Sequence, residues 1–179
     1  MSKLNRAAGV EYEALDAFKQ YAQTAARSTS DRLNSFGFSE AAGSRGETAY
    51  VVDVGDFYIA FTPEGLGTKN LIADIMSETS GFERGYYTAG WDTVAIIAND
   101  LVAVGAQPVV ISPHWGLGNS QWLADTKSSE ALIDGWKDAC IASGAAYGAG
   151  ETAELRGIIY PNTVELSGAG WGIIRPKNR

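Results

Sequence analysis

The chain has 179 residues, of which 45% are hydrophobic and 11% aromatic, a composition typical of a folded globular protein with a core of its own. Its net charge of −7 argues against nucleic acid or an anionic membrane surface as the main partner. An acidic protein that binds polyphosphate needs a cation, for which magnesium is the natural candidate.

Cysteine content and hydropathy further limit the class of protein. Cys140 is the only cysteine, so no internal disulfide framework forms, and its helical context favours a buried, inert thiol. No apolar stretch approaches the ~20 residues of a membrane span, and the N-terminus lacks the apolar region of a signal peptide. We therefore expect a single domain over residues 1–179, located in the cytoplasm.

The first part of the chain is predicted to form a helix, a loop and two strands. Val10–Ala26 has amphipathic helical spacing, and Ser28–Gly46 is rich in loop-forming residues. Within that loop, Phe36–Phe38 forms either a flap over a site or, as we favour, a loop pinned by two aromatic side chains. Strands are expected at Ala49–Val54 and Phe57–Thr62.

The stretch Phe61–Asn70, with the sequence F-T-P-E-G-L-G-T-K-N, joins a predicted strand to a predicted helix. Gly65 and Gly67 carry no Cβ and allow the backbone to approach a ligand closely. Lys69 lies where the helix begins, and helix N-termini attract phosphate. Glu64 lies beside them and can hold a divalent cation. The alternative is an ordinary turn that needs glycine, with a solvated glutamate and lysine.

The middle of the chain is predicted to be largely helical. A short helix is expected at Lys69–Ser77, followed by an aromatic and glycine-rich connection at Ser80–Gly90. Trp91–Val104 is apolar almost all round, which is typical of a buried helix, and Gly105 can end it as a C-cap.

Three polar residues interrupt this apolar helix. Asp92 can cap its first turn. Asn99 and Asp100 have no such structural explanation, and a buried carboxylate needs a partner or a metal. Asp92 and Asn99 are two helical turns apart and therefore share a face.

The last part of the chain alternates strands with one helix. A strand is expected at Pro108–His114, a loop at Trp115–Asp125 and a helix at Ser128–Ser143. For His114, the only histidine, a structural or surface role is favoured over a catalytic one.

The chain is predicted to end in a short and a long strand. A short strand at Ala145–Gly150 leads into an acidic turn at Glu151–Glu154, and Asn162–Arg175 is the long strand. Its glycines indicate close contact with another element or subunit. Its candidate core positions are Val164, Leu166, Ala169, Trp171 and Ile173.

Three acidic positions therefore follow turns or helix ends: Glu64, then Asp92 with Asp100, then Glu151 with Glu154. If they converge in space, they make an oxygen-rich site suited to magnesium and nucleotide phosphates.

Several motifs resemble those of one family, in the same order. They are G-L-G-T-K at Gly65–Lys69, D-T-V-A-I-I-A-N-D at Asp92–Asp100, G-A-Q-P at Gly105–Pro108, G-A-G-E-T-A-E at Gly148–Glu154, and A-A-G-V at Ala7–Val10. In this order and spacing they resemble aminoimidazole ribonucleotide synthetase, also called phosphoribosylformylglycinamidine cyclo-ligase, over its N-terminal domain.

The resemblance implies a fold and an activity. The fold is an α/β, two-layer domain with a mixed, mostly antiparallel sheet and helices on one face. Two copies form a β-barrel across a homodimer. The activity is ATP-dependent ring closure of formylglycinamidine ribonucleotide to aminoimidazole ribonucleotide, ADP and phosphate. The partners would be a nucleotide, a ribonucleotide substrate and Mg²⁺. Because the resemblance covers only the N-terminal domain, we expect the family's usual C-terminal domain to be absent and the isolated chain to be inactive.

The resemblance also assigns roles to individual residues. Lys69 and Asp100 would be catalytic, with Lys69 contacting the phosphates of ATP. The magnesium ligands would be Glu64, Asp92, Asp100 and Glu151. The nucleotide-binding residues would be Gly65, Gly67, Thr68, Lys69, Asn99, Gly150, Glu151 and Thr152.

Three departures from the family pattern stand out. Glu64 replaces the family's first aspartate, which extends the carboxylate by one methylene. The glycine-rich flap retains only Gly37 between two phenylalanines. Pro113–Trp115 replaces an Asp-Tyr pair after the strand.

Two alternatives remain open. The first is a sister ATP-using enzyme, such as selenophosphate synthetase, thiamine-monophosphate kinase or a hydrogenase-maturation enzyme. The G-E-T-A-E motif favours the cyclo-ligase, and the chain lacks the N-terminal cysteine normal in the first of these. The second is a non-catalytic nucleotide-binding or dimerisation module.

Overall fold

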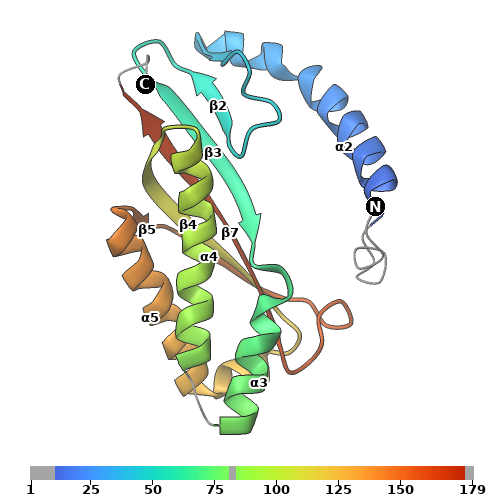
Figure 1. The fold of residues 1–179 in the computed structure, drawn as a ribbon, viewed down its shortest axis with the longest axis vertical. Coiled ribbons are helices and arrows are strands. Elements are labelled where there is room, and N and C mark those ends of the chain that lie inside the picture. The colour runs from blue at the N-terminus through green and yellow to red at the C-terminus, as the bar shows by residue number, and fades with distance from the viewer. Residues whose placement is uncertain (1–10, 81–83, 176–179) are drawn as a thin grey trace.

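The computed structural model describes residues 11–80 and 84–175, which form one sheet with helices against one face (Figure 1). The helical segments are α2 (Tyr12–Arg27), η1 (Ser30–Phe36), η2 (Gly67–Lys69), α3 (Asn70–Ser80), α4 (Arg84–Ala103), η3 (Ser120–Ala124) and α5 (Thr126–Ser143), the η segments being 3₁₀ helices. The strands are β1 (Ser39–Glu40), β2 (Tyr50–Asp53), β3 (Tyr58–Gly65), β4 (Gln107–Leu117), β5 (Ala146–Tyr147), β6 (Glu151–Glu154) and β7 (Val164–Ile174).

The sheet is mixed and open. Its order is β1-β2-β3-β7-β4-β5, and β6 also pairs with β4. The pairs β1–β2, β2–β3, β3–β7 and β4–β7 are antiparallel, whereas β5 and β6 run parallel to β4. The predicted α/β fold with a mixed, mostly antiparallel sheet is therefore confirmed. The barrel across a homodimer is not seen in this single chain and stays a prediction.

The core lies between the sheet and α4 and α5. Gly168, Gly170 and Gly172 of β7 face these helices or the neighbouring strand closely. A Cβ at Gly170 would lie 2.6 Å from Cγ2 of Ile97 on α4. Gly168 and Gly170 thus allow Ile97 of α4 to pack directly on the backbone of β7, and Gly172 allows Gln107 to approach, so the close contact with another element that their pattern indicated is confirmed.

The same glycines correct the predicted core of this strand. Val164 and Leu166 are fully buried, as expected, but Trp171 is 38% exposed. Ala169, Trp171 and Ile173 alternate with the buried glycines, so they lie on the other face of β7. The prediction was wrong for these three because it selected by hydrophobicity rather than by strand parity.

Two further boundaries differ from the prediction. Within the expected connection Ser80–Gly90, the residues from Arg84 onward instead form the first two turns of α4. Gly90 and Gly135 are interior to helices, and a Cβ at either would overlap a main-chain oxygen of the facing helix. They let α4 and α5 cross at close range. The acidic turn Glu151–Glu154 is a short strand that extends the sheet beside β4.

The N-terminal segment contributes little to the core. None of the residues of α2 is buried. Figure 1 shows that only one end of this helix lies near β2 and β3, and that the rest runs away from the sheet. The predicted loop Ser28–Gly46 contains η1 and β1. Phe36 is 73% exposed, so the interpretation of a loop pinned by both aromatics is wrong for this side chain. The A-A-G-V motif lies outside the described residues.

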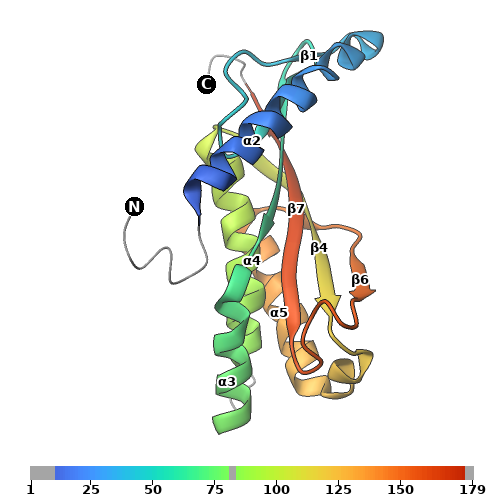
Figure 2. The same ribbon diagram turned by 90° about the vertical axis from the view of Figure 1, so that its right-hand side faces the viewer.

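The face of the sheet opposite α4 carries half-exposed apolar side chains. Phe61 of β3 and Trp171 of β7 are register neighbours there, and both are partly exposed. Figure 2 shows this face free of helices over β4 and β7.

Two further sequence features can be compared with the structure, namely the hydropathy of the helices and the environment of the Cys140 thiol. No helix in the described part of the chain is both long and apolar enough to cross a membrane. Cys140 is buried, as predicted, and its burial raises the pKa of the thiol to about 11.

Candidate functional site

The turn after β3 is shaped by glycine and anchored to the central strand. Gly67 has φ +67°, a left-handed conformation that side chains other than glycine rarely adopt. The main-chain N–H of Leu66 donates to the oxygen of Leu166 on β7 at 2.8 Å. The chain is thus held while it passes from the strand through η2 into α3.

This turn and α4 enclose a cavity of about 570 Å³, which we call the helix pocket. Its polar lining consists of Glu64, Lys69, Asp92, Asn99 and Asp100, with Gly65 at its edge. The ammonium of Lys69 forms an ion pair with the carboxylate of Asp92. Residues far apart in the sequence, from the turn and from one face of α4, therefore meet as the sequence predicts.

Two carboxylates face each other in the helix pocket. Burial raises the pKa of Asp100, and the negative charge and hydrogen bond of Glu64 raise it further. Thr48 Oγ1 donates to the main-chain oxygen of Asp100 at 2.8 Å, which ties this part of α4 to the chain before β2. A cation between the two carboxylates would relieve their repulsion, so these groups fit Mg²⁺, which is commonly bound by one or two carboxylates together with substrate phosphates.

The third acidic position lies elsewhere. Glu151 of β6 is the register partner of His114 on β4. His114 is in turn opposite Ser167 on β7, and Ser167 is opposite Gly65 on β3. Three inter-strand steps of ~4.8 Å put Glu151 roughly 14 Å from the turn. Among the described residues, no group of three or more acidic, histidine or cysteine side chains is placed to hold one metal. A single chain thus brings Glu64 and Asp100 together without Glu151.

The other predicted nucleotide-binding residues also fall into two groups, one at the helix pocket and one near β6. Thr68 is exposed on η2 next to Lys69. Gly150 and Thr152 flank Glu151 at the β6 side, where a Cβ at Gly150 would lie 2.6 Å from Cγ of Pro113. The roles assigned to Gly150, Glu151 and Thr152 stay predictions.

A second cavity, of about 550 Å³, was missed from the sequence. We call it the strand pocket, and its polar residues are Ser112, His114 and Ser167, with Glu64 and Gly65 on its border. Ser167 Oγ lies 3.0 Å from the His114 main-chain oxygen and 3.4 Å from its Nδ1. His114 is exposed, as expected, but it borders a cavity rather than open surface. The departure at Pro113–Trp115 was the only sequence signal for it.

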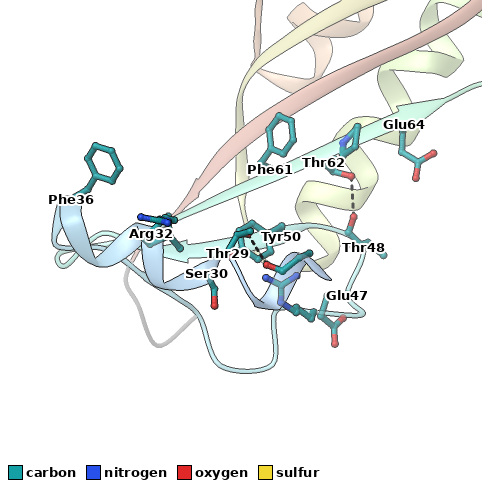
Figure 3. Close-up of a pocket in the computed structure, with 14 residues that line it drawn as sticks. Thr29, Ser30, Arg32, Phe36, Glu47, Thr48, Tyr50, Phe61, Thr62 and Glu64 are labelled. Carbon is teal, nitrogen blue, oxygen red and sulfur yellow. Dashed lines mark hydrogen bonds between the residues drawn. The ribbon is translucent and has the colours of Figure 1, made fainter. Parts of the chain in front are cut away.

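A third cavity, which we call the edge pocket, also borders Glu64 and has a volume of about 640 Å³ (Figure 3). Its main side chains are Arg32 and Phe36 from η1, Thr48 and Tyr50 from the β2 side, and Phe61 and Glu64 from β3. Glu64 borders all three cavities, so it occupies the centre of the candidate site.

A buried polar network fixes the start of α3. Asn70 Nδ2 donates to Thr163 Oγ1 at 3.0 Å and to the main-chain oxygen of Val164 at 2.6 Å. Asp74 accepts hydrogen bonds from Thr163 and from Tyr86 of α4. Burial and this hydrogen bond raise the pKa of Tyr86 well above its usual value. Because Asn70 follows Lys69 directly, the network positions the turn that bears the lysine.

Comparison with known proteins identifies relatives over most of the chain. The family described as AIR synthase related protein, N-terminal domain, matches residues 46–174. A phosphoribosylformylglycinamidine cyclo-ligase of Pyrococcus horikoshii is 31% identical over 168 residues, covering 93% of this chain and 46% of that protein. That of Thermococcus kodakarensis is 31% identical over 138 residues, covering 77% and 37%. The chain thus spans less than half the length of these relatives.

The fold also resembles a solved structure. AaThiL complexed with AMPPCP and TMP superposes with a TM-score of 0.59 at 14% identity, covering 91% of this chain and 41% of that one. At this identity the likeness concerns the fold alone.

Proposed function

Because the chain belongs to the AIR synthase related protein family, through that family's N-terminal domain, we propose that it is the nucleotide-binding half of an ATP-dependent cyclo-ligase. The reaction would convert formylglycinamidine ribonucleotide and ATP to aminoimidazole ribonucleotide, ADP and phosphate. One observation carries the proposal: Glu64, Lys69, Asp92, Asn99 and Asp100 line one cavity. The curated relatives, named as cyclo-ligases, supply the reaction.

Each residue of the helix pocket has a role in this proposal. Glu64 and Asp100 would hold magnesium, which when bound neutralises phosphate charge. Lys69 would exchange its contact with Asp92 for the phosphates, because its side chain is 55% exposed and free to move. Asn99 would orient the nucleotide, and the backbone of Gly65, Gly67 and Thr68 would approach the phosphates.

The chemistry asks for positioning more than for covalent assistance. The γ-phosphoryl group passes to the amide oxygen of the substrate with release of ADP, and an internal nitrogen then closes the ring with release of phosphate. Catalysis of such transfers consists mainly of alignment and charge neutralisation. We propose that ring closure also needs the part of the relatives that this chain does not match, so that the chain alone binds nucleotide without turnover.

The strand pocket is the natural place for the acceptor substrate. It shares Glu64 and Gly65 with the helix pocket and offers Ser112, Ser167 and His114 as hydrogen-bonding groups. Glu151 and Thr152 lie on the strand next to His114. In this arrangement they would act on the substrate side of the transferred phosphoryl group.

The chain would work as a homodimer in the cytoplasm. The exposed apolar face around Phe61 and Trp171 is suited to pairing with the same face of a second copy. Such pairing would close the open sheet into the barrel that the family resemblance implies.

The test is a calorimetric titration of the chain with ATP in the presence and in the absence of magnesium. We expect binding with magnesium and at least tenfold weaker binding in excess EDTA, which corresponds to about 1.4 kcal/mol. Absence of binding in both conditions would contradict the proposal. With a non-hydrolysable ATP analogue bound, formylglycinamidine ribonucleotide should bind as second ligand. Binding of thiamine monophosphate in its place would instead indicate a sister kinase.

A further inference from the structure

Helix α2 is amphipathic, yet none of its residues is buried against the part of the chain that the structure describes. Its apolar side, which we call the α2 stripe, consists of Ala14, Leu15, Phe18, Tyr21, Ala22 and Ala25. Phe18 and Tyr21 at its centre are 71% and 78% exposed. Helices in proteins owe most of their stability to the packing of such a face, so this helix lacks the contact that would stabilise it.

The α2 stripe faces away from the rest of its own chain. The hydrogen bond from Arg45 lowers the pKa of Glu40, and the charge of Arg27, at the end of α2, lowers it further. Arg27 therefore points toward the sheet. It follows Phe18 by about two and a half helical turns, so the two side chains lie on opposite sides of the helix. Figure 1 shows that only one end of α2 lies near the sheet.

A membrane surface is a poor partner for the α2 stripe. Helices that lie on membranes are rich in lysine and arginine on their polar face. The polar face of α2 instead balances two acids, Glu13 and Asp16, with two bases, Lys19 and Arg27. The whole chain has a net charge of −7, which anionic lipids repel. The stripe is therefore suited to a protein partner.

The α2 stripe is complementary to itself when two copies of the helix run antiparallel. With the two-fold axis between Lys19 and Gln20, an aromatic pair lies on each side of the axis and an alanine pair lies beyond it. The opposed residues are Phe18 with Tyr21 and Ala14 with Ala25. The alanines let the two backbones approach to the ~8–10 Å of packed helices. A surface that matches itself in this way forms the contact of a two-fold dimer.

Charge also favours the antiparallel arrangement. The first turn of α2 carries Glu13 and the last turn carries Arg27, so antiparallel helices place the acidic start of one beside the basic end of the other. The helix macrodipoles then also oppose each other, which is favourable. A parallel pair would bring like charges and like dipole ends together.

The size of this contact places it among weak interfaces. At ~150 Å² for each aromatic side chain, the four of a helix pair bury roughly 600 Å². Leucine and alanine side chains add to this along a helix of 16 residues, which is about 24 Å long. The total approaches the ~1,000 Å² that a specific interface needs. The helix pair is thus a second contact, additional to the open sheet face and too small to hold two copies together in dilute solution.

We propose that α2 pairs antiparallel with α2 of a second copy of this chain, with Phe18 packed on the partner's Tyr21. The contact uses neither the pockets around Glu64 nor the exposed sheet face, so it goes beyond the proposed function and does not depend on it.

The experiment is disulfide cross-linking of Ala14→Cys/Ala25→Cys by a mild oxidant, with the whole chain at high concentration. The two positions are about 16 Å apart along one helix, beyond the ~7 Å that a disulfide spans, so any bridge between them joins two chains. The native Cys140 is buried. The matched control, Asp16→Cys/Gln23→Cys, has the same two-fold centre but lies on the outer face of the helix.

We expect a covalent dimer from Ala14→Cys/Ala25→Cys, and none above background from the control or from either single variant. Adding Phe18→Glu should lower the dimer yield about tenfold or more, because pairing would bury an unpaired charge. Circular dichroism should show an unchanged fold, since no residue of α2 is buried. Absence of the dimer, equal yield from the outer-face control, dimers from a single variant, or a yield insensitive to Phe18→Glu would each overturn the proposal.

Discussion

Asp100 is the residue at which the site and the stability of the fold are most directly coupled. Its burial and its proximity to Glu64 raise its pKa in the folded chain, whereas in the unfolded chain an aspartate titrates near ~3.9. The folded state therefore binds this proton more readily than the unfolded state does. The resulting stabilisation is complete below the unfolded-state pKa and is lost as the pH rises through the folded-state pKa.

This coupling predicts how stability depends on pH. Without divalent cations, the free energy of unfolding of the wild type should fall relative to that of Asp100→Asn as the pH rises from about 4 to about 7. Urea denaturation across this range measures the difference. Asp16→Asn, a change at an exposed position on α2, serves as control. Parallel pH curves for wild type and Asp100→Asn would contradict the assigned cause of the shift.

Lys69 should matter for binding and little for folding. Its ion pair with Asp92 is half exposed, and such pairs contribute about 0–1 kcal/mol to stability. Lys69→Met should therefore leave the denaturation midpoint nearly unchanged while weakening Mg-ATP binding about tenfold or more. Lys137→Met is the matched control, because Lys137 is 49% exposed and also paired with aspartates. Normal ATP affinity in Lys69→Met would remove the lysine from the phosphate site.

At the level of elements, glycine determines how closely the two long helices approach. A Cβ at Gly135 of α5 would overlap the Tyr87 oxygen of α4, which is main chain and cannot turn aside. Gly135→Ala should destabilise the fold by about 1–3 kcal/mol, the usual cost of overpacking. Gly65→Ala is the comparison, since the nearest atom to its Cβ would be 3.5 Å away. Equal stability of the two variants by thermal denaturation would show that the helices separate freely.

The elements also show which features a sequence reveals. The positions of Lys69 and of the polar face of α4 were predictable, because each depends only on neighbouring residues. A turn motif fixes the lysine at the start of a helix, and helical spacing puts the polar residues on one face. The covered face of β7 was predictable only at Val164 and Leu166, because glycines occupy the next three buried positions and the exposed side carries Trp171. The first turns of α4 were assigned to a connection because Gly85 and Gly90 read as loop residues, whereas they serve close helix packing. The position of Glu151 depends on which strand β6 joins, and spacing along the chain carries no such information.

At the scale of the whole molecule, the open sheet face predicts self-association. Trp171 is 38% exposed at the centre of this face, so Trp171→Glu should place a charge at the interface and yield a monomer. Ile158→Glu alters a more exposed side chain, at 78%, in the segment between β6 and β7 and is the control. Sedimentation velocity distinguishes the outcomes. A wild-type chain that is monomeric at all concentrations would exclude the dimeric barrel.

The central claim is that the acidic side chains of Glu64, at the end of β3, and Asp100, on α4, together bind the nucleotide through its cation. Its most direct test is calorimetry with Mg-ATP on Glu64→Gln, Asp100→Asn and Glu151→Gln. The geometry predicts that the first two each lose about tenfold or more in affinity and that Glu151→Gln, on the far side of the sheet, loses less. Wild-type affinity in both Glu64→Gln and Asp100→Asn would contradict the claim.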